Sequence, residues 1–457
     1  MAALGVDTVH TLVHWRGFVP SPTADKRPAG FDGTDPADYP SDRWNPLDDL
    51  LRGAQARGLQ VILTPTSQVP RWAERCSDRE RRRYWAHVCK PSPTLFGDFV
   101  EALARRYDGT YRDESDGATL PAVTRWSIWN EPNQGGWLAP QTKRVGRRTV
   151  SVAASAYRSL VHQATGALRV AGHAGDQVLL GETAPLGGGS ANSTAPVPFY
   201  ETLFCVDHRG HRLRGDVARA TGCRRKPKRM AVTGIAHHPY TRGAGDALLK
   251  KQPTGAITIA YTSRLRHVAR LGARSGAISK RVGGQVFFTE FGVSSKPPGE
   301  RYSVPLATQA EWINQADYIA FRDPAVRGVA QYGLEDDTTF RRKTFQTGLC
   351  FPNGADPCYP KAAWDAYRVP LYVVDRGKRV LVFGQARPTG ANPRQVIEVQ
   401  NRAGSSAQWQ TVDTVELNAA GYFMKAIPKL PGTWRLSWTP RLGATPFLSR
   451  EAVPRKR

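Results

Sequence analysis

The segment that decides the fold is TRWSIWNEPNQGGWLAP, Thr124–Pro140, which starts as an apolar strand and then changes character. Arg125–Trp129 is dominated by large apolar residues, as expected of a buried strand. Glu131 follows at once, between Asn130 and Pro132. A single glutamate at a strand end is usually just solvated, so the role of Glu131 has to be judged from the rest of the chain.

Apolar runs like this one recur along the chain, separated by longer helical or loop segments. The runs are Asp7–Val13, Leu59–Thr64, Arg125–Trp129, Gln177–Gly181, Gly234–His238, Gln285–Thr289 and Gly328–Gly333. Two intervening segments, 46–57 and 94–107, carry apolar residues at helical spacing. The alternation of short strands with helices predicts parallel βα units.

Each run is followed by residues that a purely structural strand has little use for. They are His14 and Trp15, Pro65 and Thr66, Asn130 and Glu131, Glu182, His238 to Tyr240, Glu290, and Glu335 and Asp336. In a (β/α)₈ barrel, side chains just beyond the carboxyl ends of the strands build the active site. Residues 1–369 are therefore predicted to form an α/β domain, a (β/α)₈ TIM barrel, with its active site at these strand ends.

The chain changes character after about residue 370. Residues 371–440 contain short alternating strands joined by turns rich in Gly, Pro and Asn, without helical spacing. Residues 370–445 are predicted to form a small all-β sandwich, which either binds glycan or covers one flank of the barrel. Residues 446–457 are predicted to be a basic tail, and its last three residues, Arg455 to Arg457, are predicted to be a frayed terminus and not a binding site.

Glu131 and Glu290 are the residues that indicate a chemistry. Each ends a predicted strand, three βα units apart, and in a closed barrel such ends converge on one mouth. Paired carboxylates on opposite sides of a sugar carry out glycoside hydrolysis, one as proton donor and the other as nucleophile or base. That mechanism needs no metal ion or organic cofactor, and no ligand cluster in the sequence suggests one.

Several short motifs resemble a known clan. WNEPN (Trp129–Asn133) and TEFG (Thr289–Gly292) look like the retaining (β/α)₈ glycoside hydrolases whose acid/base follows strand four and whose nucleophile follows strand seven. HPY (His238–Tyr240) and the WNEPN run are most similar to families 39 and 5. TPT (Thr64–Thr66) and PRW (Pro70–Trp72) also resemble family 42. The Asn-Glu-Pro motif is fairly specific at a strand end, whereas Thr-Glu-Phe-Gly alone is weak.

This resemblance, which covers about residues 4–340, implies roles for individual residues. It implies Glu131 as general acid/base and Glu290 as nucleophile. Asn130 would bond the sugar 2-hydroxyl, and His238 and Tyr240 would flank and orient Glu290. Three tryptophans offer ring faces for sugar stacking, although ordinary packing explains each of them equally well. They are Trp15, Trp72 and Trp137.

A retaining mechanism requires the two glutamates to differ in pKa. Glu290 is expected to stay ionised among hydrogen-bond donors, and the pKa of Glu131 is expected to be raised so that it holds a proton. The predicted outcome is retention of anomeric configuration. His10, in the run Gly5–Trp15, stands where many relatives carry Arg near the nucleophile. Because histidine titrates near neutral pH, activity is expected to depend on His10 protonation.

Other functions are less well supported by the sequence. The main alternative is a catalytically inactive carbohydrate-binding barrel at the cell surface, and a basic wall-anchored structural protein is a weaker one. The sugar, the linkage and the choice between exo and endo action stay open. The net charge of +25 fits an anionic cell-surface polymer as a partner. Nucleic acid is not expected, since no recognised binding motif accompanies the charge, and no run of apolar residues is long enough to span a membrane.

The six cysteines fall into three close pairs. The pairs are Cys76 with Cys89, Cys205 with Cys223, and Cys350 with Cys358. Each pair brackets a predicted surface loop, and none has zinc-finger spacing. Three local disulfides, and with them a secreted or extracytoplasmic location, are therefore predicted, although the sequence opens without a secretory leader.

The strand count leads to a further expectation. Glu131 follows the third recognisable run and Glu290 the sixth, whereas the resemblance places them after strands four and seven. One strand before Met1 would restore both positions and close the sheet. The sequence therefore suggests that Met1 is internal to a longer natural chain, which would also hold the leader. The 457-residue form is expected to fold poorly or be inactive unless another segment fills the gap.

Overall fold

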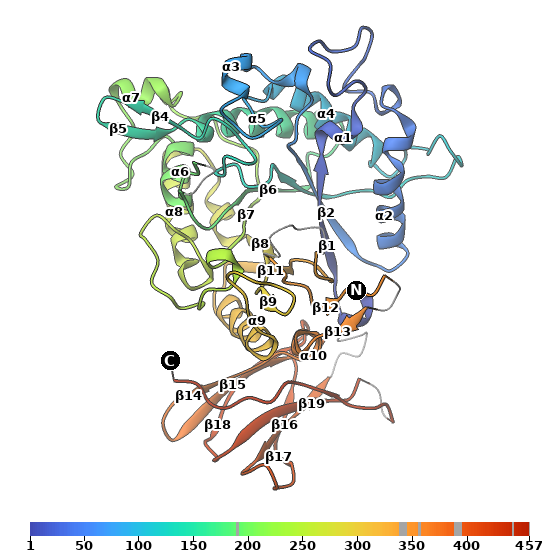
Figure 1. Cartoon of the computed structure of the whole chain (residues 1–457), viewed down its shortest axis with the longest axis vertical. Helices are drawn as coiled ribbons and strands as arrows, with labels where there is room; N and C mark the ends of the chain where they lie inside the picture. The colour runs from blue at the N-terminus through green and yellow to red at the C-terminus, as the bar shows by residue number, and fades with distance from the viewer. Residues whose placement is uncertain (189–191, 338–344, 355–357, 388–394, 441–442, 457) are drawn as a thin grey trace.

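The computed structural model describes residues 1–188, 192–337, 345–354, 358–387, 395–440 and 443–456 (Figure 1). Its centre is a parallel sheet of seven strands. In sheet order these are β1 (Thr8–His14), β2 (Gln60–Thr66), β3 (Arg125–Ile128), β6 (Gln177–Thr183), β7 (Gly234–His237), β8 (Val286–Phe291) and β11 (Val326–Gln331). They are the seven runs predicted from the sequence, in chain order. Because the strands are parallel, their carboxyl ends lie along one rim of the sheet.

Helices cover the outer face of the sheet, as the predicted βα units require (Figure 1). The principal ones are α2 (Asn45–Gln55), α4 (Pro93–Arg106), α5 (Ala153–Val170), α6 (Pro196–Leu203), α8 (Ser263–Ser275) and α9 (Leu306–Phe321). In α4, Pro93 sits in the first turn, where its missing N–H costs nothing. The apolar stripe of α4, which includes Phe96, Phe99 and Leu103, is buried in the core. The fold is that of a (β/α)₈ barrel, and the predicted fold class is confirmed.

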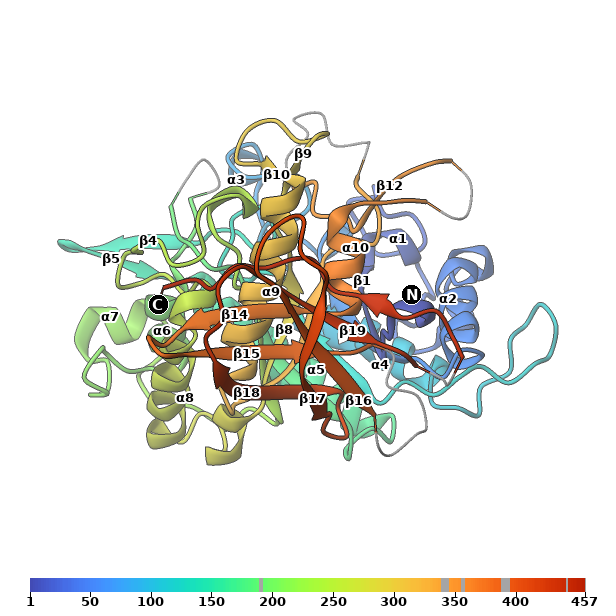
Figure 2. The same cartoon turned by 90° about the horizontal axis from the view of Figure 1, so that it is seen from below.

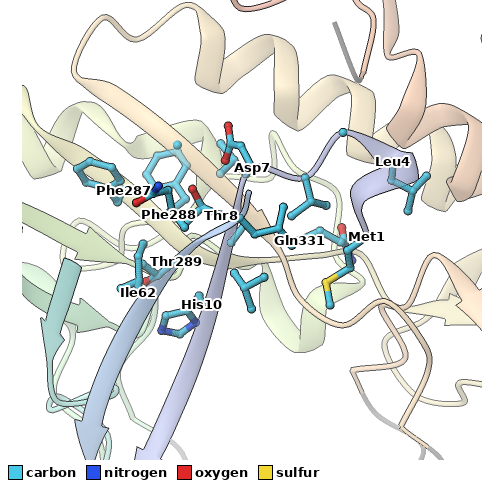
Figure 3. Close-up of a pocket in the computed structure, with 18 of the residues that line it drawn as sticks. Met1, Leu4, Asp7, Thr8, His10, Ile62, Phe287, Phe288, Thr289 and Gln331 are labelled. Atoms are coloured by element: carbon cyan, nitrogen blue, oxygen red, sulfur yellow. The ribbon is translucent and has the colours of Figure 1, made fainter. Parts of the chain in front are cut away.

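The sheet is open between β11 and β1, the two strands at its edges. β2 is buried along almost its whole length, whereas most residues of β1 and β11 are only half-buried. A cavity of about 1260 Å³ lies along this opening. Figure 3 shows Thr8 and His10 from the β1 side, and Phe287 and Thr289 from β8, among the residues that line it.

Two antiparallel sheets follow the barrel and form the predicted all-β unit. One contains β14 (Leu371–Asp375), β15 (Arg379–Gln385) and β18 (Tyr422–Pro428), and the other contains β17 (Gln410–Glu416), β16 (Val396–Arg402), β19 (Thr433–Trp438) and β20 (Phe447–Leu448). They share an apolar core that includes Val382, Ile397 and Trp434. Figures 1 and 2 show α9 and α10 (Ala362–Arg368) between the barrel sheet and this unit.

The segment predicted as a basic tail pairs with its neighbours. Phe447 pairs with Trp438 across β20 and β19. Arg455 exchanges backbone hydrogen bonds with the β14 strand, donating to Val373 at 2.9 Å. Its guanidinium also donates to Glu311 of α9 at 2.7 Å. The prediction of a frayed terminus is therefore wrong at Arg455, which pairs with two elements distant in sequence, whereas Arg457 lies outside the described residues.

The three predicted cysteine pairs are all disulfides: Cys76–Cys89, Cys205–Cys223 and Cys350–Cys358. Each bridge closes a loop of fewer than about 20 residues, as expected for local staples. In the described part of the chain, no helix combines the length and the apolar character needed to cross a membrane.

Candidate active site

Glu131 lies just beyond β3, in backbone that is locally strained. Trp129, Glu131 and Glu182 all have positive φ angles, of 70°, 38° and 58°. Residues other than glycine rarely adopt this conformation, which costs on the order of 1–3 kcal/mol and is concentrated at functional sites. The backbone N–H of Glu131 donates to the carbonyl oxygen of Glu182 at 3.1 Å. The ends of β3 and β6 are thereby tied to each other at the mouth of the barrel.

His238 stands between the two glutamates singled out in the sequence. Its Nδ1 lies 3.1 Å from Oε1 of Glu131 and 3.6 Å from Oε2 of Glu290. The His238 side chain is fully buried, whereas Glu131 is 19% and Glu290 13% exposed. Both carboxylates can therefore meet a ligand in the mouth, while the imidazole behind them cannot be reached from solvent.

The charge on His238 follows from these neighbours. Burial alone lowers the pKa of an imidazole, because it disfavours the charged form. Three carboxylates outweigh burial here and raise the pKa of His238 to about 9. They belong to Glu290, Glu131 and Glu182. His238 is therefore an imidazolium at neutral pH, with hydrogen atoms on both ring nitrogens.

Glu290, at the end of β8, is held by a second donor. The Tyr240 hydroxyl donates to its Oε2 at 3.2 Å. Burial raises the pKa of Glu290, His238 opposes that rise, and the nearby Glu131 carboxylate adds to it. The net direction is upward, whereas the sequence predicted that hydrogen-bond donors would keep Glu290 ionised. This difference in pKa direction arises because Glu290 is buried more deeply than its polar neighbours in the sequence suggested.

Glu182, at the end of β6, is a member of the site that the sequence did not single out. Its side chain is fully buried, and its Oε1 accepts a hydrogen bond from the Thr64 hydroxyl at 3.0 Å. Burial raises the pKa of Glu182, but His10 and His238 outweigh it and lower the pKa overall. Glu182 is therefore ionised. Its place among the polar strand ends was visible in the sequence, but its two histidine partners were not.

His10 faces Glu182 rather than Glu290. Its Nε2 lies 2.8 Å from Oε1 of Glu182 and 3.0 Å from the hydroxyl of Thr64. His10 and Glu290 line the same cavity, so His10 is part of the site. It reaches the two catalytic candidates through another carboxylate and not by direct contact.

The three tryptophans predicted to stack on a sugar differ in how far they are buried. Trp15 is only 1% exposed and packs against Phe99 in the core, so the prediction that it stacks on a sugar is wrong. Trp72 is half-buried with its ring edge-on to Trp15. Trp137 is half-buried at the mouth, stacked on His14 at a ring distance of 6.0 Å. Trp15 is buried because its ring packs against Phe96 and Phe99.

Asn130 is buried beside Glu131, and its backbone N–H donates to the Thr66 hydroxyl at 3.0 Å. Its Oδ1 accepts no hydrogen bond from the described residues. A buried acceptor of this kind ordinarily has a partner, and the predicted contact of Asn130 with a sugar hydroxyl stays a prediction.

A metal centre finds little support in the described residues. One group of suitable side chains lies close together, Glu335 with Cys350 and Cys358. Both cysteines are joined in a disulfide, so neither supplies the thiolate that a metal ion requires.

No family model matches the sequence, and no curated protein matches it either. The likeness to families 39, 5 and 42 therefore stays a prediction. Among solved structures, a glucosidase from Croceicoccus marinus is 11% identical, with a TM-score of 0.48 over 94% of this chain and 88% of that one. Endo-glycoceramidase II from Rhodococcus sp. is 14% identical, with a TM-score of 0.46 over 93% and 90%.

A family 1 β-glucosidase from Thermotoga maritima is 11% identical, with a TM-score of 0.42 over 80% of this chain and 83% of that one. At these values the likenesses assign neither a family nor an activity to this chain.

Proposed function

We propose that the chain is an O-glycoside hydrolase that acts by a retaining double displacement, with Glu131 as acid/base and Glu290 as nucleophile. The observation that carries the proposal is the pair of partly exposed carboxylates facing one buried histidine at the barrel mouth. Two carboxylates on either side of a substrate bond are the basic requirement of glycoside hydrolysis.

The separation of the two carboxylates favours retention. Oε1 of Glu131 and Oε2 of Glu290 lie 3.1 and 3.6 Å from the same nitrogen. Their separation cannot exceed the sum of these distances, which only reaches the lower edge of the range of about 6.5–9.5 Å found in inverting enzymes. A nucleophilic water molecule would have little room between them.

The reaction then proceeds in two balanced steps. The Glu290 carboxylate bonds to the anomeric carbon as the bond to the leaving oxygen breaks, and Glu131 gives that oxygen a proton. A water molecule next gives a proton to Glu131 and bonds to the anomeric carbon, which releases Glu290. Asn130, with its buried acceptor oxygen, is placed to bind the sugar 2-hydroxyl, and Trp137 offers a ring face at the mouth.

The setting of this activity is also a proposal. Disulfides persist in oxidising compartments, so the three bridges support action outside the cytoplasm. The net charge of +25 favours an anionic glycan, or an anionic polymer nearby, over a neutral one. Turnover of a panel of aryl glycosides and of anionic and neutral wall polysaccharides would identify the substrate class.

Replacement of Glu290 tests the function directly. Glu290→Ala is expected to lose nearly all activity on an aryl glycoside, and azide is expected to restore it by forming a glycosyl azide. The physical reason is that azide fills the space of the missing carboxylate and attacks the same carbon. An NMR time course of the wild type should show the retained anomer first. No turnover of any glycoside, with ligand binding intact, would instead support a catalytically inactive carbohydrate-binding barrel.

A further inference from the structure

We propose that Glu182 is a positioning residue of this site, which holds His10 and His238 and sets the protonation of Glu131 and Glu290 through His238. The proposal rests on the hydrolase function above and extends it to a third carboxylate. Glu182 has no exposed surface, so it acts on the other residues of the site and not on substrate.

The geometry of Glu182 places it between two histidines. Its Oε1 lies 2.8 Å from Nε2 of His10, and its Oε2 lies 3.8 Å from Nε2 of His238. The opposite nitrogen of His238 faces Glu131 and Glu290. One imidazolium is therefore surrounded by three carboxylates, and Glu182 faces the side of the ring away from Glu131 and Glu290, at ion-pair distance without a hydrogen bond.

A purely structural role explains this arrangement poorly. Three charged or titratable side chains with almost no exposure meet inside the barrel, and each loses its hydration there. An apolar filling of the same volume is often as stable or more stable. The positive φ of Glu182 adds local strain. Costs of this kind are concentrated at functional sites, which favours a role in setting protonation.

The charge balance of the cluster shows what Glu182 contributes. Glu182 places one negative charge beside the imidazolium of His238, on the side of the ring away from Glu131 and Glu290. The first chemical step needs one proton on that pair of carboxylates, and a nearby anion favours holding it. Without the charge of Glu182 that proton is held less tightly, because an anion has been removed from its surroundings.

The groups that face Glu182 come from several strands. They are His10 on β1, Thr64 on β2, Ser127 on β3 and His238 after β7, with Glu131, Glu290 and the Tyr157 hydroxyl farther away. Among these described groups, only the two imidazoles can carry a positive charge. The expected pH effects therefore depend on Glu182, His10 and His238 together.

The test is the pH profile of kcat/KM in Glu182→Gln, a change of nearly equal size and shape that removes the charge. Both limbs of the profile are expected to move to lower pH by roughly one unit, as for loss of a neighbouring charge. Glu201→Gln on α6 is the control, since Glu201 is a partly buried glutamate that belongs to no part of the site, and its profile should match the wild type. A lower kcat with unmoved limbs would overturn the proposal.

A second measurement does not depend on turnover. In protein labelled at histidine, NMR should show the titration of His238 at lower pH in Glu182→Gln than in the wild type. Glu182→Asp keeps the charge and should keep the titration of His238 near its wild-type position, even if shortening the side chain lowers kcat. An unchanged His238 titration in Glu182→Gln would reject the proposal. Absence of glycoside turnover in the wild type would reject only the hydrolase function.

Discussion

The chemistry proposed for this protein depends on a few charged side chains gathered at strand ends. His238 is the central one, because it joins Glu131 to Glu290 and carries a positive charge where a retaining mechanism needs one carboxylate ionised and the other protonated. The pKa of His238 is raised to about 9. The stabilisation from its ion pairs with the carboxylates is therefore fully present below its ordinary pKa of about 6.5, and it is lost as pH rises through 9. The site is thus built for neutral conditions.

Substitution of His10 tests whether activity depends on the protonation of this residue. Histidine titrates near neutral pH, whereas arginine stays charged. His10→Arg is expected to remove the part of the kcat/KM profile that reflects titration at residue 10, since a fixed cation then faces Glu182. His267→Arg on α8, the same change outside the site, should leave the profile as it is. A profile that His10→Arg does not alter would mean that activity is independent of His10 protonation.

At the scale of the elements, each strand delivers its last residues to the same rim and the helices bury the opposite side. Glu201 on α6 shows how helix packing constrains a charged residue. Burial, with a smaller effect of Asp207, raises the pKa of Glu201 to about 7. The folded state therefore binds a proton at Glu201 more tightly than the unfolded state does.

This sign gives a prediction for stability. The contribution of Glu201 is fully present below about pH 4.5, its unfolded value, and is lost as pH rises through 7. Glu201→Gln should remove that loss and stabilise the protein at pH 8 by about 1–2 kcal/mol, less than the full shift implies because the side chain is partly exposed. Thermal unfolding of both proteins at pH 4.5 and 8 checks this. Equal differences in unfolding temperature at the two pH values would contradict it.

At the scale of the whole molecule, the barrel and the β unit are joined through α9. Tyr318 of α9 stacks on Tyr372 at a ring distance of 5.2 Å, and Phe321 packs against the buried Phe383. Arg455 adds a paired contact to Glu311. The β unit thus covers one flank of the barrel, the simpler of the two roles considered from the sequence.

The joint should make unfolding of the two parts cooperative. Phe383→Ala is expected to destabilise the protein by about 3–5 kcal/mol, the usual cost of truncating a buried aromatic ring. Circular dichroism and residual activity should fall together at the lower temperature. Met424→Ala, on a neighbouring strand but 43% exposed, should have little effect. If activity kept its wild-type midpoint in Phe383→Ala, the two parts would be independent.

The opening between β11 and β1 is also a feature of the whole molecule. Both edge strands present backbone groups that have no neighbouring strand among the described residues. The cavity along them is lined by residues from Asp7 to Glu290 and so connects the open flank with the proposed nucleophile. A closed sheet would separate these two regions.

The sequence by itself determined the features that depend on short stretches of chain. The seven strands, their polar ends and the three disulfides could be predicted because apolar runs, turn residues and close cysteine pairs are local signals. Glu131 and Glu290 could be singled out because each directly follows such a run.

Only the tertiary structure decided which side chains meet. Glu182 lies between His10 and His238 because three strands far apart in sequence converge on one rim. Trp15 is buried in the core, where it packs against Phe99. Arg455 pairs with the β14 strand. The direction of the Glu290 pKa likewise depends on burial, which no local pattern records. The burial of a side chain, its partners and the charges around it depend on which residues pack together in the folded protein. They therefore do not follow from the order of residues alone.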